Sequence, residues 1–204
     1  MTRLICLVLA LGFLLLASGV YLWGSGQSRL SSADRDGDKA EAKAVLKNAA
    51  GGKVAKVTFE DDDDGVRVKV VPLDAALPAG FHGFHVHAND DPANGTGCAA
   101  PSFVSADGHL KASGQDHPSH QGDMPVLLVM VDGTTEARFV TDRFSVGDII
   151  GRAVIIHANP DNYANIPLGA AGDQYTANSP AATAATAATG NAGARTACGV
   201  IEAD

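Results

Sequence analysis

The sequence predicts an all-β domain of the sandwich or barrel type, running from about residue 42 to residue 204. Valines alternate with charged residues from Val66 to Val70, the pattern of a strand with one buried face. Further short β-branched and apolar runs follow, separated by turns with Gly, Asp or Pro, and no segment has the periodicity of an amphipathic helix. Aromatic residues are only 5% of the chain and glycine contributes 23 residues, which favours a loop-rich β domain over a helical bundle.

The first 26 residues differ in composition from the rest. Leu4–Trp23 carries no charge and, as a helix, is long enough to cross a hydrocarbon layer of about 30 Å. Small residues at Ala17–Gly19 also fit a signal-peptidase site. We therefore expect residues 1–26 to be a signal peptide or a membrane anchor helix, followed by a polar tether at 27–41. Either alternative exports the domain to the periplasm or the cell surface, and an uncleaved segment would hold it in the cytoplasmic membrane.

Six runs in the remainder are expected to form strands: Lys53–Glu60, Val66–Val70, Phe81–His87, Val126–Val131, Ala137–Thr141 and Ala153–His157. The acidic run Asp61–Asp64 precedes a glycine and predicts a solvated hairpin tip between the first two of these strands. Residues 88–125 and 159–195 do not have the pattern of strands, and loops of such length are usually functional. The low-complexity sequence AATAATAAT, residues 181–189, is expected to be a flexible surface loop.

All seven histidines lie between residues 82 and 157. His85 and His87 are two apart on a predicted strand, so both imidazoles point to one face and can chelate one ion. His82 has the opposite parity, and we expect it to be a non-ligating surface or loop residue. His157 ends a strand and offers a third imidazole near the loops.

The remaining candidates for metal ligands lie in the first long segment: His109, His117, His120 and Asp123. Three imidazoles with one carboxylate are a common tetrahedral set for zinc. An all-imidazole set suits copper, which takes nitrogen ligands in tetragonal geometry and can change redox state. The sequence therefore predicts a metal site.

Six sequence blocks resemble the copper/zinc superoxide dismutases, most closely their exported bacterial members. The blocks are GFHGFHVH (80–87), GC (97–98), DGHL (107–110), HQGD (120–123), VIIHANPDNYANIP (154–167) and GNAGARTACGVI (190–201). They occur in the family's order and span about residues 42–204. The resemblance implies a Greek-key, immunoglobulin-like β-sandwich. It also implies the dismutation of superoxide to oxygen and hydrogen peroxide by copper that cycles between Cu(II) and Cu(I).

The resemblance implies two metal sites that share one histidine. The copper ligands would be His85, His87, His109 and His157. The zinc ligands would be His109, His117, His120 and Asp123.

Other residues match the family's supporting positions. Asp161 would hydrogen-bond one histidine of each metal site and fix the tautomers of both rings. Cys98 and Cys198 would form the intradomain disulfide. Arg195 would hold the superoxide anion at the mouth of the site, and His109 would also supply a proton.

Two features depart from the family pattern. Only Pro118 and Ser119 separate two of the zinc histidines, fewer residues than usual, so a copper-only enzyme stays open as an alternative. Residues 174–194 contain no charged side chain, whereas the family's last long loop carries charges that guide superoxide. We therefore expect a rate that depends less on salt than is usual in the family.

Two other functions agree with part of the sequence. A non-enzymatic exported copper-binding or copper-buffering domain would keep the ligands but would not need Arg195 or Asp161. A structural or adhesive β-sandwich would bind no copper tightly. The formal net charge of −8 argues against a nucleic-acid partner. A homodimer agrees with the resemblance, although no stripe of residues identifies a contact surface.

Overall fold

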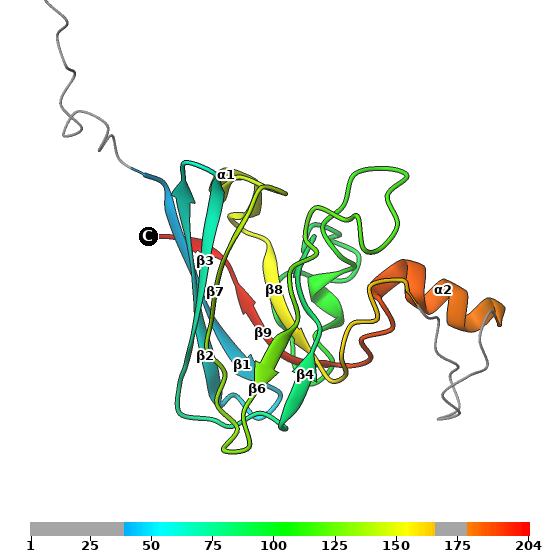
Figure 1. Cartoon of the computed structure of the whole chain (residues 1–204), viewed down its shortest axis with the longest axis horizontal. Helices are drawn as coiled ribbons and strands as arrows, with labels where there is room; N and C mark the ends of the chain where they lie inside the picture. Colours follow the sequence, from blue (N-terminus) through cyan, green and yellow to red (C-terminus); the bar gives the residue numbers. More distant parts are fainter. Residues whose placement is uncertain (1–38, 166–178) are drawn as a thin grey trace, which may run out of the picture. The chain divides into compact units, whose positions relative to one another are not determined.

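The computed structural model describes residues 39–165 and 179–204 (Figure 1). The chain divides into a compact unit, Asp38–Asp204, and a preceding part, Met1–Gly37. Within the described ranges, no helix is long and apolar enough to cross a bilayer. The leader expected at residues 1–26 and nearly all of the tether expected at 27–41 lie outside the described residues, so both stay predictions.

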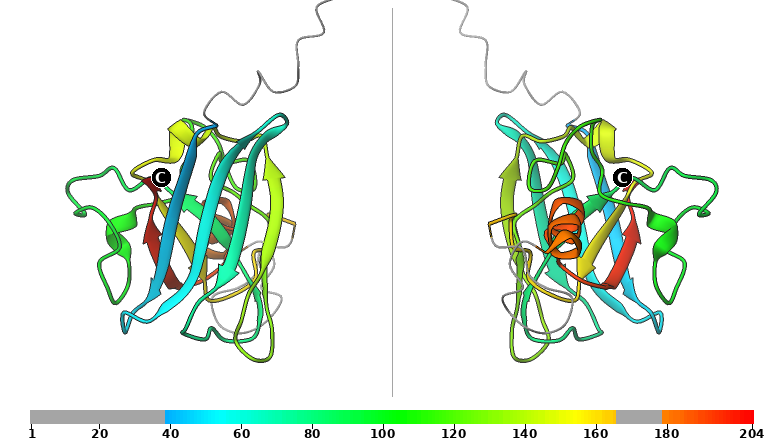
Figure 2. Two further views of the ribbon diagram at one scale, coloured as in Figure 1. Left: turned by 90° about the vertical axis from the view of Figure 1, so that its left-hand side faces the viewer. Right: turned by 90° about the vertical axis from the view of Figure 1, so that its right-hand side faces the viewer.

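Eight strands form one antiparallel sheet, with the order β5-β8-β9-β1-β2-β3-β7 and β10 paired with β1. They are β1 (Glu41–Asn48), β2 (Lys53–Asp62), β3 (Gly65–Pro72), β5 (Phe84–His87), β7 (Ala137–Thr141), β8 (Ala153–His157), β9 (Arg195–Val200) and β10 (Glu202–Ala203). A separate two-stranded ribbon pairs β4 (Gly80–His82) with β6 (Leu127–Val129). The large sheet curls (Figure 2), and its neighbours β3–β7, β5–β8 and β9–β1 are not consecutive in the chain. This curled antiparallel arrangement confirms the predicted all-β sandwich or barrel.

The core explains why the alternating segments form strands. In β2 and β3 the register places Phe59 opposite Val68 and Val57 opposite Val70, and all four side chains are buried. Strands β5 and β8 are buried at every position. In β5, Phe84 and Val86 belong to the core, so the alternate residues of that strand point to its other face.

Four of the predicted strands are found: β7 and β8 have the predicted bounds, and β2 and β3 extend slightly beyond them. The run Phe81–His87, however, is broken at Gly83 into β4 and β5. A Cβ at Gly83 would lie 2.6 Å from the Cβ of Ala192 and 3.0 Å from Cε1 of His85. The Gly83 amide donates to Asn159 O, and its carbonyl accepts from His157 N. The break therefore comes from close packing between distant segments. Of the predicted strand Val126–Val131, only Leu127–Val129 forms a strand, which is β6.

The hairpin tip between β2 and β3 was predicted correctly. Asp63 and Asp64 form the turn there, and both are exposed. The exposed carboxylates at this turn confirm the predicted solvated hairpin tip.

The prediction of a flexible loop at residues 181–189 was wrong, because these residues belong to helix α2 (Pro180–Thr189). Ser179 caps its first turn by accepting from Ala182 N at 3.1 Å, and Pro180 occupies the start of the helix. Gly190, with φ 59°, ends it. Alanine has the highest helix propensity, so a capped Ala/Thr repeat forms a helix. The other helices are short: α1 (Val146–Ile149) and the 3₁₀ turn η2 (Val104–Ala106).

Candidate metal centre

Four histidines from separate elements converge at one point. One nitrogen from each of His85, His87, His109 and His157 lies within 4.8 Å of the others, and all four residues are buried. Strand β5 supplies the first two, and the end of β8 supplies His157. A β-bridge to His87 holds His109.

The spacing of these nitrogens suits a shared ion. Nε2 of His87 lies 3.3 Å from Nε2 of His157. Two nitrogens bound to one tetrahedral ion at about 2.0–2.1 Å would lie about 3.4 Å apart. The four rings that the sequence singled out as a set are therefore brought together.

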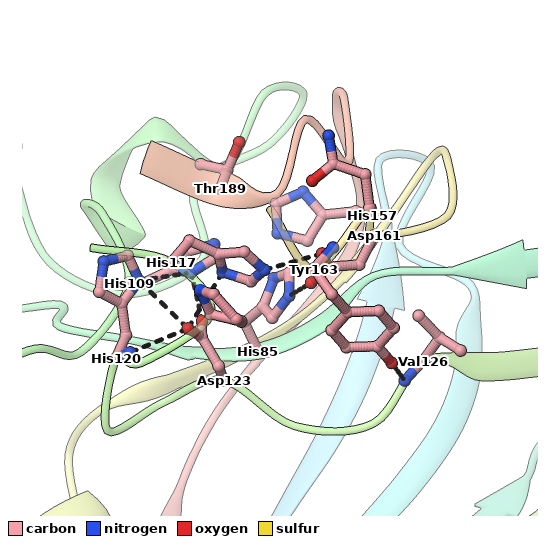
Figure 3. Close-up of polar contacts among 12 residues, drawn as sticks. His85, His109, His117, His120, Asp123, Val126, His157, Asp161, Tyr163 and Thr189 are labelled. Carbon is pink, nitrogen blue, oxygen red and sulfur yellow. Dashed lines mark hydrogen bonds and ion pairs between the residues drawn. The ribbon is translucent and has the colours of Figure 1, made fainter. Parts of the chain in front are cut away.

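A second group lies beside the first around a carboxylate (Figure 3). Ligand atoms of His85, His109, His117 and Asp123 also lie within 4.8 Å of one another. Asp123 Oδ1 is 2.8 Å from His109 Nδ1, and its Oδ2 is 3.0 Å from His117 Nδ1.

His120 is adjacent to this group, although it does not belong to the tightest set. Its Nδ1 lies 3.3 Å from Nδ1 of His109 and 3.4 Å from Oδ2 of Asp123. Its backbone amide donates to the same Oδ2 at 3.0 Å. The structure thus brings His109, His117 and Asp123 together and places His120 next to them.

Each ring of the first group, and His117 beside it, has one nitrogen held by the protein. His87 Nδ1 lies 2.8 Å from the carbonyl of Asp107, and His157 Nδ1 lies 3.1 Å from the carbonyl of Gly193. Asp161 holds two more rings, with Oδ2 at 2.7 Å from Nε2 of His85 and Oδ1 at 2.7 Å from Nε2 of His117. Such contacts fix the tautomer and the orientation of metal-binding histidines.

The remaining nitrogens of three of these rings are also buried. His85 Nδ1 and His109 Nε2 have no hydrogen-bond partner among the described residues, and His117 Nδ1 faces the Asp123 carboxylate at 3.0 Å. Buried polar atoms normally find a partner, because leaving one unpaired costs free energy. Neutral imidazole nitrogens and one carboxylate are suitable ligands for copper and zinc. The donor set therefore fits both ions.

The electrostatics differ between the rings of the two groups. Burial, reinforced by the neighbouring histidines, lowers the pKa of His157 to about 3. It also lowers the pKa of His109 to about 4, although the hydrogen bond that His109 donates to Asp123 acts in the opposite direction. Burial acts on His117 too, but Asp123 and Asp161 overcome it and raise the pKa of His117 to about 9. The first two rings are thus neutral at neutral pH and ready to bind a metal, whereas His117 must first lose a proton.

Asp161 links the two groups of rings. It is buried in the segment after β8 and accepts a third hydrogen bond from Tyr163 N at 2.7 Å. Burial disfavours its charge, but bonds from His117 and His85 outweigh this and hold its pKa well below the usual range. An ionised Asp161 is the acceptor that both rings require.

Arg195 lies at an opening near the first group. Its guanidinium donates to the carbonyls of Phe103 and Asp107. It lines a cavity of about 560 Å³ with five residues that carry no charge: Pro101, Ser102, Val104, Gly193 and Ala194. A larger cavity of about 660 Å³ lies beside the disulfide, and no histidine lines either cavity. The planar donor fork of Arg195 in the smaller cavity suits a small anion.

The predicted disulfide is present between Cys98 and Cys198, which are 100 residues apart. It attaches the first long segment to β9. Closing a loop of that length restricts the unfolded chain and contributes about 4–5 kcal/mol in the chain-entropy model.

Some residues at the site were misjudged from the sequence. His82 was correctly expected to be outside the ligand sets, but it is buried rather than at the surface. Its Nδ1 lies 2.7 Å from the carbonyl of His157, and its Nε2 lies 2.8 Å from the carbonyl of Pro78. No sequence signal showed that the strand containing it would turn inward at Gly83.

The role of helix α2 was also missed. The carbonyl of Ala187 accepts from the backbone amide of His117 at 2.9 Å. A Cβ on Gly190 would lie 2.0 Å from Oδ1 of Asp161 and 2.6 Å from Nε2 of His117. The end of α2 therefore packs directly on the bond between these two residues, and the Ser-Pro pair at 179–180 with Gly190 was the signal for it.

Known proteins share both the sequence pattern and the fold. The family model for copper/zinc superoxide dismutase (SODC) matches residues 53–201. "Superoxide dismutase [Cu-Zn]" of Mycolicibacterium paratuberculosis is 37% identical over 168 residues, covering 78% of this chain and 72% of that protein. "Superoxide dismutase [Cu-Zn] 2" of Brassica juncea is 34% identical over 161 residues, covering 78% of this chain and 94% of that protein.

Two crystal structures have a similar fold. The clock protein EA4 superposes with a TM-score of 0.59 at 29% identity, covering 80% of this chain and 94% of EA4. A double mutant of a SOD-like protein from Bacillus subtilis gives a TM-score of 0.55 at 25% identity, covering 77% of this chain and 94% of that one. With the family match across most of the chain and the convergent histidines, the conclusion is that this chain belongs to the copper/zinc superoxide dismutase family.

Proposed function

We infer that the histidine cluster is the catalytic centre of a superoxide dismutase. As a member of its family, the chain converts two superoxide anions and two protons into oxygen and hydrogen peroxide, with copper and zinc as cofactors. The observation that carries this inference is the convergence of four buried imidazoles beside a second, carboxylate-centred group.

The nitrogen atoms that face the cluster support an assignment of ligands. For copper we assign Nδ1 of His85 and Nε2 of His87, His109 and His157. For zinc we assign Nδ1 of His109, His117 and His120, and the carboxylate of Asp123. His109 belongs to both sets, since its Nδ1 faces Asp123 at 2.8 Å while its Nε2 has no described partner.

Copper, when bound, supplies a centre that takes one electron from one superoxide and returns it to the next. The protein's part is to bind and orient the substrate and to move protons. Arg195 carries a permanent charge on a planar fork of donors, so it can hold a superoxide anion at the opening. The carbonyls of Phe103 and Asp107 fix that fork in place.

The second superoxide must receive protons before it leaves as peroxide. His109 would take up a proton at Nε2 when that atom is released from copper, and would give it to the second superoxide. Its other nitrogen is held against Asp123, so the ring keeps its orientation whether or not Nε2 carries the proton.

Metal content and superoxide consumption, measured on one purified sample of the full chain, test the function. We expect one copper and one zinc per chain and rapid consumption of superoxide. Copper without zinc, in an active protein, would favour the copper-only alternative. Tight copper binding without superoxide consumption would favour a copper-buffering domain and contradict the function.

Location and assembly are separate proposals. The uncharged stretch Leu4–Trp23 and the disulfide Cys98–Cys198 both support export, because disulfides persist in oxidising compartments. Cell fractionation of the full chain and of a chain without residues 1–26 tests export, and a full chain found in the cytoplasm would contradict it.

Membrane association requires that the leader is not cleaved. The N-terminal sequence of the purified protein shows whether it is. The homodimer stays a prediction that light scattering on the same sample tests.

A further inference from the structure

Asp107 has a backbone conformation that glycine nearly always provides. Its dihedral angles are φ 60° and ψ −159°, immediately after the 3₁₀ turn η2. An L-residue with a Cβ is strained there, and such strain persists only where the surroundings enforce it. Asp107 lies two residues before His109, in the segment that reaches the centre.

The carboxylate of Asp107 provides that enforcement. Its Oδ2 accepts from the backbone amides of Asp90 and Asp91, each at 2.8 Å. Its Oδ1 accepts from the side-chain amide of Asn94 at 3.0 Å. The Asp107 side chain thus ties this residue to the segment that follows β5.

The carbonyl of Asp107 serves two residues of the centre at once. It accepts from Nδ1 of His87 at 2.8 Å and also from the guanidinium of Arg195. The direction of a carbonyl depends on ψ of its own residue, so a change at Asp107 would turn the acceptor away from both donors together. One backbone atom therefore links a proposed copper ligand to the proposed anion-binding group.

We propose that Asp107 is a positioning residue whose anchored carboxylate holds its carbonyl in place, so that one atom orients both His87 and Arg195. The proposal rests on the proposed function. It predicts that anion binding and copper geometry change together when the anchor is removed, although the carboxylate itself touches neither the metal ligands nor the substrate.

Three substitutions in the full chain separate the anchor from the backbone conformation. Asp107→Ala removes the carboxylate and keeps the strain, Asp107→Gly removes both, and Asp107→Asn keeps an acceptor oxygen and tolerates positive φ. The probe is azide, a small monovalent anion, titrated into copper-loaded protein and followed by absorption. Cu(II) electron paramagnetic resonance reports the environment of His87.

We expect azide affinity to fall about tenfold in Asp107→Ala, about threefold in Asp107→Gly and less than about twofold in Asp107→Asn. The Cu(II) spectrum should change in the same order. In a chain that already carries Arg195→Ala, Asp107→Ala should weaken azide binding no further, because the two residues act through one contact.

Asp132→Ala is the matched control. The carboxylate of Asp132 also anchors a turn, accepting from the Thr134 amide at 3.0 Å and from its hydroxyl at 2.7 Å. That turn joins β6 to β7 and contains no ligand residue. The control should change thermal stability and leave azide affinity and the Cu(II) spectrum as they are.

A folded, copper-loaded Asp107→Ala protein with unchanged azide affinity and spectrum would overturn the proposal. If Asp107→Ala does not fold, Asp107→Gly is the deciding variant. Azide binding that is weaker in Asp107→Gly and close to wild type in Asp107→Asn supports the proposal, and unchanged azide binding in Asp107→Gly overturns it. A wild-type chain that binds no copper would instead contradict the proposed function, so the two failures are distinguishable.

Discussion

The histidines on strands and the metal residues on the loop are held by different means. His85, His87 and His157 are on β5 and β8, two adjacent strands that are buried throughout. Their backbone positions follow from the hydrogen-bond ladder of the sheet. The sheet thus fixes their backbone atoms, while their rings are held by contacts from the loops: His85 by Asp161, His87 by the Asp107 carbonyl and His157 by the Gly193 carbonyl.

His117 and His120 lie in a segment without regular secondary structure and depend on contacts from elsewhere. The carbonyl of Ala187 in α2 holds the amide of His117, and Asp161 holds its ring. Arg143 donates to the carbonyls of Pro118 and His120, each at 2.9 Å. The sheet thus sets the backbone positions of three of the four proposed copper ligands, whereas packing between loops sets the positions of His117 and His120, two of the proposed zinc ligands.

The largest expected effect separates the two parts by removing one ligand from each. His87→Ala should lower copper affinity and the rate of superoxide consumption by more than about 100-fold, since even supporting residues of metal sites contribute about 10–100-fold. His120→Ala should lose zinc but keep copper, with a rate within about tenfold of wild type. Metal analysis and a superoxide assay measure both. Equal losses of copper in the two variants would contradict the distinction.

Asp161→Asn should weaken both metals, because this residue holds a ring in each part. An amide can accept from only one of the two rings, so the other loses its orientation. We expect copper and zinc to bind about 10–100-fold more weakly, measured by competition with chelators. A loss confined to one metal would show that Asp161 supports that part alone.

Gly190→Ala tests whether α2 supports the loop. Its Cβ would collide with Asp161 and His117, so zinc affinity should fall about tenfold while copper is retained. Gly51→Ala is the control: Gly51 has φ 84°, and no described atom lies within 4 Å of its Cβ position. Gly51→Ala should lose about 1 kcal/mol of stability through backbone strain alone, and Gly190→Ala should lose more because of the collision. Zinc loss in Gly51→Ala, or full zinc retention in Gly190→Ala, would refute the role of α2.

The metal-free protein should show opposite pH dependences in its two parts. The pKa of His157 is lowered to about 3 from 6.5, so the unfolded chain takes up a proton first and stability falls as pH decreases from about 6.5. The pKa of His117 is raised to about 9 from 6.5, so its stabilisation is complete below about pH 6.5 and disappears as pH rises through about 9.

Thermal unfolding of the metal-free protein across this pH range measures both effects. His117→Gln should abolish the alkaline decline and leave the decline due to His157 in place. Zinc binding near neutral pH should release about one proton from His117, whereas copper binding should release none from His109 or His157. An alkaline decline that persists in His117→Gln would show that another group causes it.

The smallest expected effect concerns the salt dependence of the rate. Residues 174–194, which include α2, contain no charged side chain. Long-range attraction of superoxide therefore depends on few groups, chiefly Arg195, within a chain of net charge −8. We expect the rate to fall less than about twofold between about 10 and 200 mM salt. A steep decline would show that charges elsewhere guide the anion.

The same comparison explains which features the sequence could predict. The side-chain period of two placed His85 and His87 on one face, and the β-branched runs located β2, β3, β7 and β8, because these signals are local. Strand β1, with the sequence EAKAVLKN, was not singled out. Its Ala, Lys, Glu and Leu residues have little strand preference, and pairing with β2 and β9 determines its conformation.

Features that depend on long-range contacts were missed. The break at Gly83 follows from Ala192, more than a hundred residues away. The conformation of Asp107 follows from amides in the preceding loop. Helix α2 did carry local signals in Ser179, Pro180 and Gly190, but the low complexity of the repeat concealed them. For the metal residues, the resemblance to a family supplied the grouping that spacing alone left open.

Crystals of the metal-loaded full chain, measured at the copper and zinc absorption edges, test the central claim most directly. We predict a copper signal bound by Nδ1 of His85 and by Nε2 of His87, His109 and His157. A zinc signal should lie on the Asp123 side of His109, with that ring between the two ions. Copper bound at the Asp123 group instead, or no copper among the four imidazoles, would contradict the claim.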